Sequence, residues 1–301
     1  MRVVVALGGN ALLKRGESPD ASIQQDNIRL AVSSIAQLAR HHDVVVTHGN
    51  GPQVGMLALE SERDGSLTVP YPLDVLGAET EGMVGYWLQR ELTNSLPGRE
   101  IVTVLTQTVV DAADPAFTDP AKFIGPVYDE ATAKRTAAQL GWTVKRDGPH
   151  WRRVVPSPTP IEFIELASIK TLVDSGALVV CAGGGGVPVV RTAGGLEGVE
   201  AVVDKDRAAA LLARNLGADV LLLLTDVPAV EIDFGTPSAR PLGRVTVREL
   251  RTMTFAAGSM APKVAAACDF VEAGGRLAAI GLLDRALALS SGETGTVVVR
   301  G

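Results

Sequence analysis

The sequence predicts an α/β protein built around a mainly parallel β-sheet. Several strand-length runs, among them residues 220–224, are apolar throughout, which is typical of strands buried on both faces. These runs pass into glycine-rich turns and then into segments with helical spacing, the order in which parallel strands and crossover helices follow one another. Because ligands of such sheets bind beyond the carboxyl ends of the strands, the glycine turns mark the predicted ligand crevice.

The composition excludes several classes of protein. The 301 residues, 46% of them hydrophobic, suffice for one large α/β domain or two average ones. The formal net charge is −6 and there is no basic run, so we expect no nucleic-acid partner. The apolar runs are too short to span a membrane, and without a secretory leader we expect a cytoplasmic protein. Cys181 and Cys268 stand in apolar stretches and are interpreted as buried free thiols.

The first strand, residues 2–7, ends in a turn formed by Gly8, Gly9 and Asn10. Glycine lets a ligand approach the backbone closely, and the unpaired N–H groups of a following helix attract an anion. The turn is therefore a candidate phosphate or oxyanion cradle, with an ordinary strand-to-helix turn as the alternative.

A second turn of this kind follows a predicted helix at 26–40 and a strand at 43–47. It runs through His48, Gly49, Asn50 and Gly51 and leads into a helical stretch from Met56. Neither turn has the spacing of the P-loop or of the dinucleotide-binding fingerprint. For His48 we favour a neutral histidine bonded to backbone over a general base.

The next region changes character after a predicted helix at 80–96 and a strand at 101–106. From 111 to about 160 the chain is rich in Asp, Pro, Gly and aromatic residues, and only 130–140 has helical spacing. So long an irregular stretch predicts a mobile lid or protruding subdomain, and it contains Lys122.

The third glycine turn is the longest. A helix at 161–175 and a strand at 178–181 lead to four glycines that begin with Gly183, Gly184 and Gly185, which implies a very close approach of the backbone to another group. Asp204, Lys205 and Asp206 then precede a predicted helix at 207–216. Capping is the expected role of Asp204.

The C-terminal part predicts a buried strand with its C-terminal turn at 219–227, a helix at 264–273, late strands at 277–281 and 296–299, and a turn at 290–296. Pro262 suits the first turn of its helix, which places Lys263 near a helix N-terminus, where a cation is unfavourable unless an anion lies between them. The chain has 7 Lys against 21 Arg. Lys122, Lys205 and Lys263 stand beside Gly or Pro turns or strand ends, where a compact charge suits a phosphoryl oxygen.

Six motifs then carry a resemblance to a known family. They are Ala-Leu-Gly-Gly-Asn at 6–10, His-Gly-Asn-Gly-Pro-Gln-Val-Gly at 48–55, Gly-Gly-Gly-Gly-Val-Pro at 183–188, Val-Asp-Lys-Asp at 203–206, Leu-Thr-Asp-Val at 224–227 and Gly-Ser-Met-Ala-Pro-Lys at 258–263. Each is weak alone, but together, in this order and over nearly the whole length, they resemble the carbamate kinases of the amino acid kinase superfamily.

The resemblance implies a single amino acid kinase-like domain over 1–301, an open αβα sandwich on a mainly parallel central sheet. The half at 1–190, with the protruding lid subdomain at about 111–160, would bind the acceptor, and the half at 191–301 would bind ADP or ATP. The implied reaction is reversible phosphoryl transfer between ATP and carbamate, giving ADP and carbamoyl phosphate, in arginine breakdown. Mg²⁺ on the nucleotide phosphates and a homodimer are also implied.

The resemblance also implies roles for individual residues. The catalytic set is Lys122, Lys205, Asp206 and Lys263, with Lys122 replacing the lysine that many superfamily members place just before the first glycine pair. The acceptor and phosphoryl oxygens would be bound by Gly8, Gly9, Asn10, Gly49, Asn50, Gly51, Gly183, Gly184 and Gly185. The nucleotide would be bound by Thr225, Asp226, Val227, Ser259 and Met260, and no residue is assigned to a metal.

Two other functions stay open at this stage. A sibling kinase with a different acid acceptor would need its own specificity group, such as an Arg near 49–55, and the sequence has none there. A non-enzymatic nucleotide or oxyanion-binding protein would not need three lysines to stabilise transition-state charge.

Overall fold

A single large β-sheet runs through the computed structural model, which describes residues 1–14, 16–255 and 260–301. Its strands lie in the order β15-β17-β16-β12-β1-β2-β9-β3. All neighbouring pairs run parallel except β16 and β17. The expected mainly parallel α/β sheet is confirmed.

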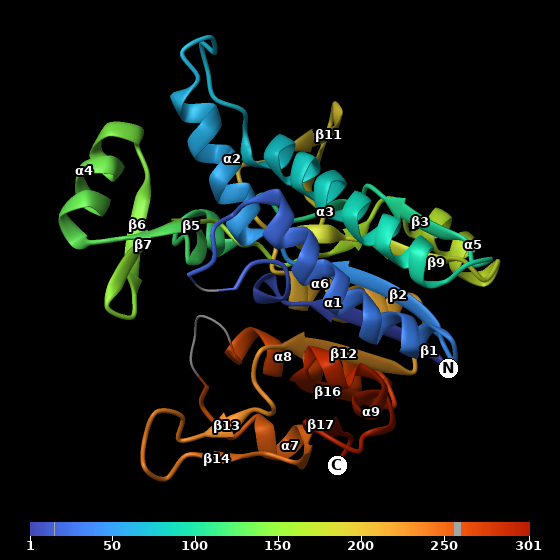
Figure 1. Cartoon of the computed structure of the whole chain (residues 1–301). Coiled ribbons are helices and arrows are strands. Elements are labelled where there is room, and N and C mark those ends of the chain that lie inside the picture. Colours follow the sequence, from blue (N-terminus) through green and yellow to red (C-terminus); the bar gives the residue numbers. More distant parts are fainter. Residues whose placement is uncertain (15, 256–259) are drawn as a thin grey trace.

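The strands of this sheet alternate their side chains between two hydrophobic cores. In β1 (Arg2–Leu7), Val3, Val5 and Leu7 face a core shared with helices α1, α3 and α9, whereas Val4 and Ala6 face a core shared with α5, α6 and α8. Helices therefore cover both faces, and the fold is the expected αβα sandwich (Figure 1). Among the described helices, none has the length and apolar character that a bilayer crossing demands.

The bounds of the elements are as follows. The other strands of the large sheet are β2 (Asp43–His48), β3 (Ile101–Val104), β9 (Leu178–Cys181), β12 (Val220–Thr225), β15 (Arg244–Thr246), β16 (Leu277–Leu282) and β17 (Thr296–Val299). The helices are α1 (Ala21–Ala39), α2 (Gly51–Arg63), α3 (Leu73–Ser95), α4 (Glu130–Leu140), α5 (Leu166–Asp174), α6 (Lys205–Asn215), α7 (Val247–Leu250), α8 (Met260–Glu272) and α9 (Ala286–Ser291). Short 3₁₀ turns are η1 (Gly9–Ala11), η2 (Pro115–Phe117), η3 (Gly183–Gly185) and η4 (Leu283–Arg285).

Three smaller sheets complete the fold. One has the order β11-β10-β4-β8 and is made by β4 (Gln107–Val109), β8 (Glu162–Phe163), β10 (Val187–Thr192) and β11 (Gly195–Gly198). Another is the hairpin of β13 (Glu231–Ile232) and β14 (Arg240–Pro241). The third has the order β5-β7-β6 and is made by β5 (Lys122–Tyr128), β6 (Thr143–Asp147) and β7 (His150–Val155).

The segment at 111–160 does protrude from the main body, but it is not irregular. It forms the sheet of β5, β6 and β7 with α4 packed on it, and this unit stands apart in Figure 1. The sequence concealed these strands because they are mixed rather than apolar, as in Thr-Val-Lys-Arg-Asp of β6. The expected helix at 130–140 is confirmed.

Other boundaries differ from expectation for identifiable reasons. α1 begins at Ala21 rather than at 26, because its first turn is polar and does not show the apolar period. α2 begins at Gly51 rather than at 56, since Pro52 suits a first turn. The predicted helix at 161–175 is a short strand followed by α5, and the predicted turn at 290–296 overlaps the end of α9.

Candidate active site

A cavity of about 770 Å³ lies at the carboxyl ends of β1 and β12. Its walls include the first glycine turn, the start of α6, the start of α8 and the start of β5. The residues that line it include Gly8, Gly9, Lys122, Asp204, Lys205, Asp206, Thr225, Asp226, Val227, Met260 and Lys263. The crevice is thus where the glycine turns predicted it, and the four predicted catalytic residues meet in it.

Asp206 joins two of the predicted lysines. The Lys205 ammonium lies 2.5 Å from one carboxylate oxygen of Asp206, and the Lys263 ammonium lies 2.9 Å from the other. All three residues are at most 9% exposed. Asp206 therefore holds the two ammonium groups apart and fixed in direction.

Asp204 has a second role beside the expected cap. One of its carboxylate oxygens accepts from the backbone N–H groups of Asp206 and Arg207, at 3.0 and 3.2 Å, which caps α6. The other oxygen accepts from the Lys122 ammonium at 2.5 Å. Through this ion pair the protruding subdomain is tied to the start of α6.

Burial and pairing oppose each other in the pKa values of this cluster. Burial alone would raise the pKa of both Asp204 and Asp206. The ammonium group of Lys122 instead holds the pKa of Asp204 below its ordinary value. Lys205 and Lys263 do the same for the pKa of Asp206. Burial lowers the pKa of Lys205 to about 8, although Asp206 opposes the shift. Burial would also lower the pKa of Lys263, but the attraction of Asp206 outweighs it and leaves that pKa raised. Lys205 is therefore the ammonium whose charge depends most on pH.

The first glycine turn is packed closely against β12. The Gly8 N–H donates to the carbonyl oxygen of Leu224 at 3.1 Å, and a Cβ on Gly8 would lie 3.1 Å from that oxygen. Gly8 and Gly9 both line the cavity. Asn10 follows in η1, and its side chain is not described.

The second and third glycine turns pack against each other next to the cavity rather than in its wall. A Cβ on Gly184 would lie 2.2 Å from the side chain of Asn50, and one on Gly49 would lie 3.2 Å from the Lys205 side chain. The expected close approach of the third turn to another group is confirmed by this contact between Gly184 and Asn50. Gly184 also has a φ of +67°, which favours glycine at this position. The second turn continues through Gly51, where α2 begins.

Several N–H groups of these turns already have partners inside the protein. The Gly49 N–H donates to Leu7, the Gly185 N–H to Ala182 and the Gly183 N–H to the side chain of Glu81. With Gly8, these groups do not offer free donors to a ligand in this conformation. The binding of acceptor and phosphoryl oxygens by the other residues of the three turns stays a prediction.

His48 is the neutral, backbone-bonded histidine that we favoured. It is fully buried, its Nδ1 lies 3.2 Å from the carbonyl oxygen of Gly49, and burial lowers its pKa to about 4. At neutral pH it carries no charge.

The residues expected to bind nucleotide are found on one side of the cavity. Thr225 ends β12, Asp226 and Val227 follow it, and all three line the cavity together with Met260 at the start of α8. Ser259 lies outside the described residues. Sequence reasoning missed the β13–β14 hairpin, which adds Phe234, a side chain 74% exposed. Its strands have two residues each, too short to give a periodic signal.

The described residues contain no group of three or more His, Cys, Asp or Glu side chains placed to hold a metal ion. Both carboxylate oxygens of Asp206 are engaged by lysines.

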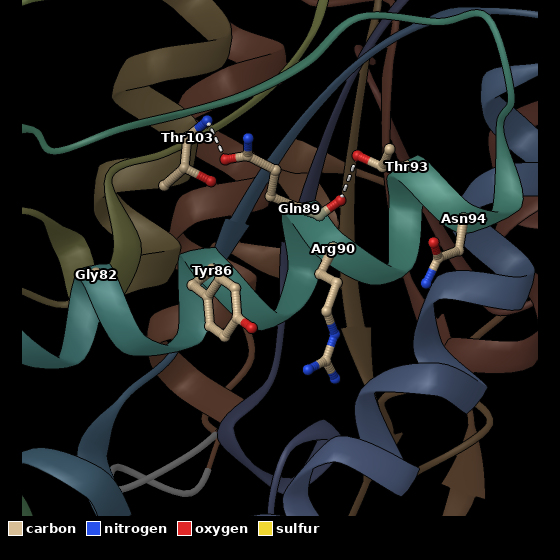
Figure 2. Close-up of a pocket in the computed structure, with 7 residues that line it drawn as sticks. All are labelled: Gly82, Tyr86, Gln89, Arg90, Thr93, Asn94 and Thr103. Carbon is tan, nitrogen blue, oxygen red and sulfur yellow. Dashed lines mark hydrogen bonds between the residues drawn. The ribbon is translucent and has the colours of Figure 1, made fainter.

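A second, shallower hollow lies on the outer face of α3 (Figure 2). Its lining includes Tyr86, Gln89, Arg90 and Thr103, with the Gln89 side chain accepting from the Thr103 N–H at 3.0 Å. It holds none of the predicted site residues, and it has no cluster of ammonium groups. The ammonium groups that we expect to bind a phosphate line the larger cavity instead.

Comparison with known proteins gives a consistent result. The model of the amino acid kinase family matches residues 1–281. A carbamate kinase of Rhizobium meliloti is 53% identical, with 99% of this chain and 93% of that protein covered. A carbamate kinase of Pyrococcus furiosus is 47% identical, with 99% of each covered.

Solved structures agree with the sequences. Carbamate kinase from Giardia lamblia bound to citric acid is 40% identical with a TM-score of 0.94, and 100% of this chain and 98% of that chain are covered. The same enzyme bound to AMP-PNP, also 40% identical, has a TM-score of 0.89 with the same coverage. The chain therefore belongs to the amino acid kinase family, and within that family to the carbamate kinases.

Proposed function

We propose that this protein catalyses reversible phosphoryl transfer between ATP and carbamate, giving ADP and carbamoyl phosphate. The observation that carries the proposal is the cluster of three ammonium groups, from Lys122, Lys205 and Lys263, oriented by Asp204 and Asp206 in one cavity. The membership of the chain among the carbamate kinases supports the choice of carbamate as acceptor.

The reaction requires positioning and charge stabilisation more than proton transfer. An oxygen of carbamate, already anionic, attacks the γ-phosphorus in line, and the bond to the bridging oxygen of ADP breaks. The transferring group carries its charge on three equatorial oxygens. Fixed ammonium groups in a water-poor cavity stabilise that charge without reorganising.

Lys205 and Lys263 are the groups that we assign to the transferring phosphoryl. They are held on opposite oxygens of Asp206, so their spacing is set before the substrate binds. Lys122 is assigned to the acceptor side, where β5 delivers it to the cavity from the protruding subdomain. A phosphoryl group entering between them would share ammonium groups that now bind the two aspartates.

The two halves of the large sheet suit the two substrates. We assign the acceptor to the half at 1–190, bounded by Gly8, Gly9, Asn10, Gly49, Asn50, Gly51 and Gly183, Gly184, Gly185. We assign the nucleotide to the half at 191–301, with Thr225, Asp226, Val227, Ser259 and Met260. Residue 190, where we divide the two halves, lies inside β10.

We include Mg²⁺, a homodimer and a cytoplasmic location in the proposal. Mg²⁺ would neutralise charge on the nucleotide phosphates. The homodimer has a candidate surface beside the hollow of Figure 2, where β3 forms the edge of the large sheet and Tyr86 and Leu105 are 57% and 51% exposed. Exposed apolar side chains gathered beside a sheet edge favour association.

The test is to mix the protein with ADP, Mg²⁺ and carbamoyl phosphate and to follow ATP with a coupled assay. We expect ATP to form, and acetyl phosphate to serve much more slowly if at all. A clear preference for acetyl phosphate or another acyl phosphate would identify a sibling kinase. If the folded protein binds ADP but forms no ATP from any acyl phosphate, it is a nucleotide-binding protein and not a kinase.

A further inference from the structure

Glu81 is a buried carboxyl group that the proposed mechanism does not use. It lies on α3, is 1% exposed, and has no ion-pair partner among the described residues. One of its oxygens accepts from the Gly183 N–H at 3.0 Å, and the other from the Thr106 N–H at 3.3 Å. A single side chain thus joins the third glycine turn to the chain that leaves β3.

The turn that Glu81 holds is conformationally demanding. Ala182, immediately before Gly183, has a φ of +50°, in the left-handed region that a residue with a Cβ rarely adopts. Its N–H donates to the Thr106 hydroxyl at 2.9 Å, and its carbonyl oxygen accepts from the Thr47 hydroxyl at 2.7 Å. Such a conformation persists when its surroundings determine it, and it is most common at functional sites.

The turn reaches the active cavity through the second glycine turn. Gly184 lies against the Asn50 side chain, which in turn donates to the Thr80 hydroxyl at 2.8 Å. Gly49, in the same turn as Asn50, lies against the Lys205 side chain. A displacement of the third turn would therefore also move the second turn and the side chain of Lys205.

We propose that Glu81 is a positioning residue that holds the turn at 182–185 in its working shape, and that it does so as an uncharged acid. The proposal rests on the proposed phosphoryl transfer, since the turn is useful only if it shapes the acceptor side of the cavity.

The surroundings of Glu81 favour the uncharged form. The titratable side chains around it are His48 on β2, Cys181 on β9 and Glu165 before α5, and none of them is a cation at neutral pH. Burial raises the pKa of Glu81 to about 8, although the two backbone N–H groups oppose the shift.

His48, on the other side of Gly183, is an uncharged neighbour of Glu81. Its Nδ1 faces a carbonyl oxygen, which only accepts, so Nδ1 carries the hydrogen and Nε2 is an acceptor. That Nε2 is buried without a hydrogen-bond partner. A Cβ on Gly183 would lie 2.3 Å from it and 3.0 Å from Cγ of Glu81, so both groups flank the same residue. The His48 nitrogen near Gly183 is thus an acceptor, so His48 supplies no donor that would stabilise a charged Glu81 carboxylate.

Two substitutions separate these roles. Glu81→Ala removes both hydrogen bonds, and we expect kcat with carbamoyl phosphate to fall at least about tenfold, as for other small displacements of a reacting group, while Kd for ADP stays within about twofold. Glu81→Gln keeps an uncharged side chain with one oxygen that can accept from the Gly183 N–H at 3.0 Å and gives up the longer bond from Thr106 at 3.3 Å, so we expect kcat within about threefold of the unsubstituted protein. Glu79→Gln, an exposed neighbour on the same helix, is the matched control and should change neither.

A readout without turnover keeps this inference distinct from the proposed function. Amide hydrogen exchange over 178–187 should be at least about tenfold faster in Glu81→Ala and unchanged in Glu81→Gln and in Glu79→Gln. If the unsubstituted protein forms no ATP, the proposed function fails, and hydrogen exchange still decides whether Glu81 holds the turn.

Three results would overturn the inference. Normal kcat and normal exchange in Glu81→Ala would remove Glu81 from the control of the turn. An equal loss of ADP binding and kcat would make it a general structural residue. A Glu81→Gln variant as impaired as Glu81→Ala would show that the carboxylate, accepting from both N–H groups, is the form that acts.

Discussion

At the residue scale, Asp206 explains why two lysines can be buried so close together. A buried ammonium is costly unless it is paired and hydrogen-bonded, and each carboxylate oxygen of Asp206 takes one of them. The pairing keeps both charged while the cavity is empty of substrate. It also means that Lys205 and Lys263 reach the phosphoryl group from fixed positions, which lowers the cost of organising the transition state.

We expect Lys205→Ala to lower kcat by at least about 10²-fold, the scale of losing one fixed electrostatic group in an active site. Kd for ADP, measured by calorimetry on the same preparation, should change far less because the substitution removes charge that matters most in the transition state. A kcat within about tenfold of the unsubstituted protein would instead make Lys205 a structural residue.

The pKa of Lys205 predicts that activity falls at alkaline pH. The pKa of Lys205 is about 8, and the protonated ammonium is the useful form, so kcat/KM, which reports the free enzyme, should fall as pH rises through that value. ATP formation is measured from pH 6 to 9.5 with the spontaneous decay of carbamoyl phosphate subtracted. Glu81→Gln should keep the limit if Lys205 causes it. A flat profile would contradict the assignment.

At the scale of elements, the protruding subdomain and the glycine turns complete the site from two sides. β5 carries Lys122 into contact with the cap of α6, and the turns after β2 and β9 interlock without room for side chains. The subdomain is held against the main body where a Cβ on Gly55 of α2 would lie 2.1 Å from Gly125 of β5. The position of Lys122 is therefore set by contacts at the start and in the middle of β5.

We expect Lys122→Ala to reduce turnover of carbamoyl phosphate at least about tenfold while ADP affinity and Tm stay nearly unchanged. Asp204 keeps its two backbone N–H partners in this variant, so the cap of α6 survives. Lys134→Ala, which removes an exposed ammonium from α4 of the same subdomain, is the matched control and should have no effect. Loss of ADP binding in Lys122→Ala would move Lys122 to the nucleotide side.

The close packing of the second and third glycine turns predicts that alanine costs more unfolding free energy at Gly184 than at Gly98. Gly98 and Gly184 both have positive φ, but only at Gly184 would a Cβ meet another side chain. Gly98→Ala should cost ~1–2 kcal/mol of unfolding free energy from backbone conformation alone. Gly184→Ala should cost a further ~1–3 kcal/mol from overpacking against Asn50 and should lower kcat as well. Urea unfolding measures the first quantity, and equal costs at the two positions would contradict the packing argument.

How much of each element could be predicted from sequence depended on its hydrophobic pattern. The buried strand of β9 and the helix α4 were predicted with the bounds observed, because an apolar run and a helical period are local signals. The strands of the protruding subdomain and the β13–β14 hairpin were missed, since they are short or mixed in polarity and depend on their partners in the sheet. Glu81 gave no signal because its burial and its two N–H partners arise only in the folded chain.

At the scale of the whole molecule, the large sheet brings the two halves of the chain to one crevice. β1 lies at the centre between β2 and β12, so the first glycine turn is adjacent to elements of both halves. The fold class and the meeting of Lys122, Lys205, Asp206 and Lys263 were predicted correctly. The hydrogen bonds that engage the Gly8, Gly49 and Gly183 N–H groups inside the protein gave no signal in the sequence, because their acceptors lie far away along the chain.

The proposed homodimer predicts a molar mass of twice the 31.4 kDa of one chain. Sedimentation equilibrium should give this value, and Tyr86→Glu, which places a charge on the exposed face of α3, should shift the equilibrium toward the monomer. A charge at Val127, an equally exposed position in the protruding subdomain, is the control. A monomer at all concentrations would contradict the proposed assembly.

The central claim is that this cavity transfers a phosphoryl group directly between carbamoyl phosphate and ADP. Phosphorus-31 NMR of the protein with both substrates and Mg²⁺ tests it most directly, because it resolves carbamoyl phosphate, the γ-phosphate of ATP and free phosphate in one sample. We predict that the γ-phosphate signal grows one for one with the enzyme-dependent loss of carbamoyl phosphate, and that Lys205→Ala slows this growth strongly. Release of free phosphate alone, or no change beyond spontaneous decay, would contradict the account.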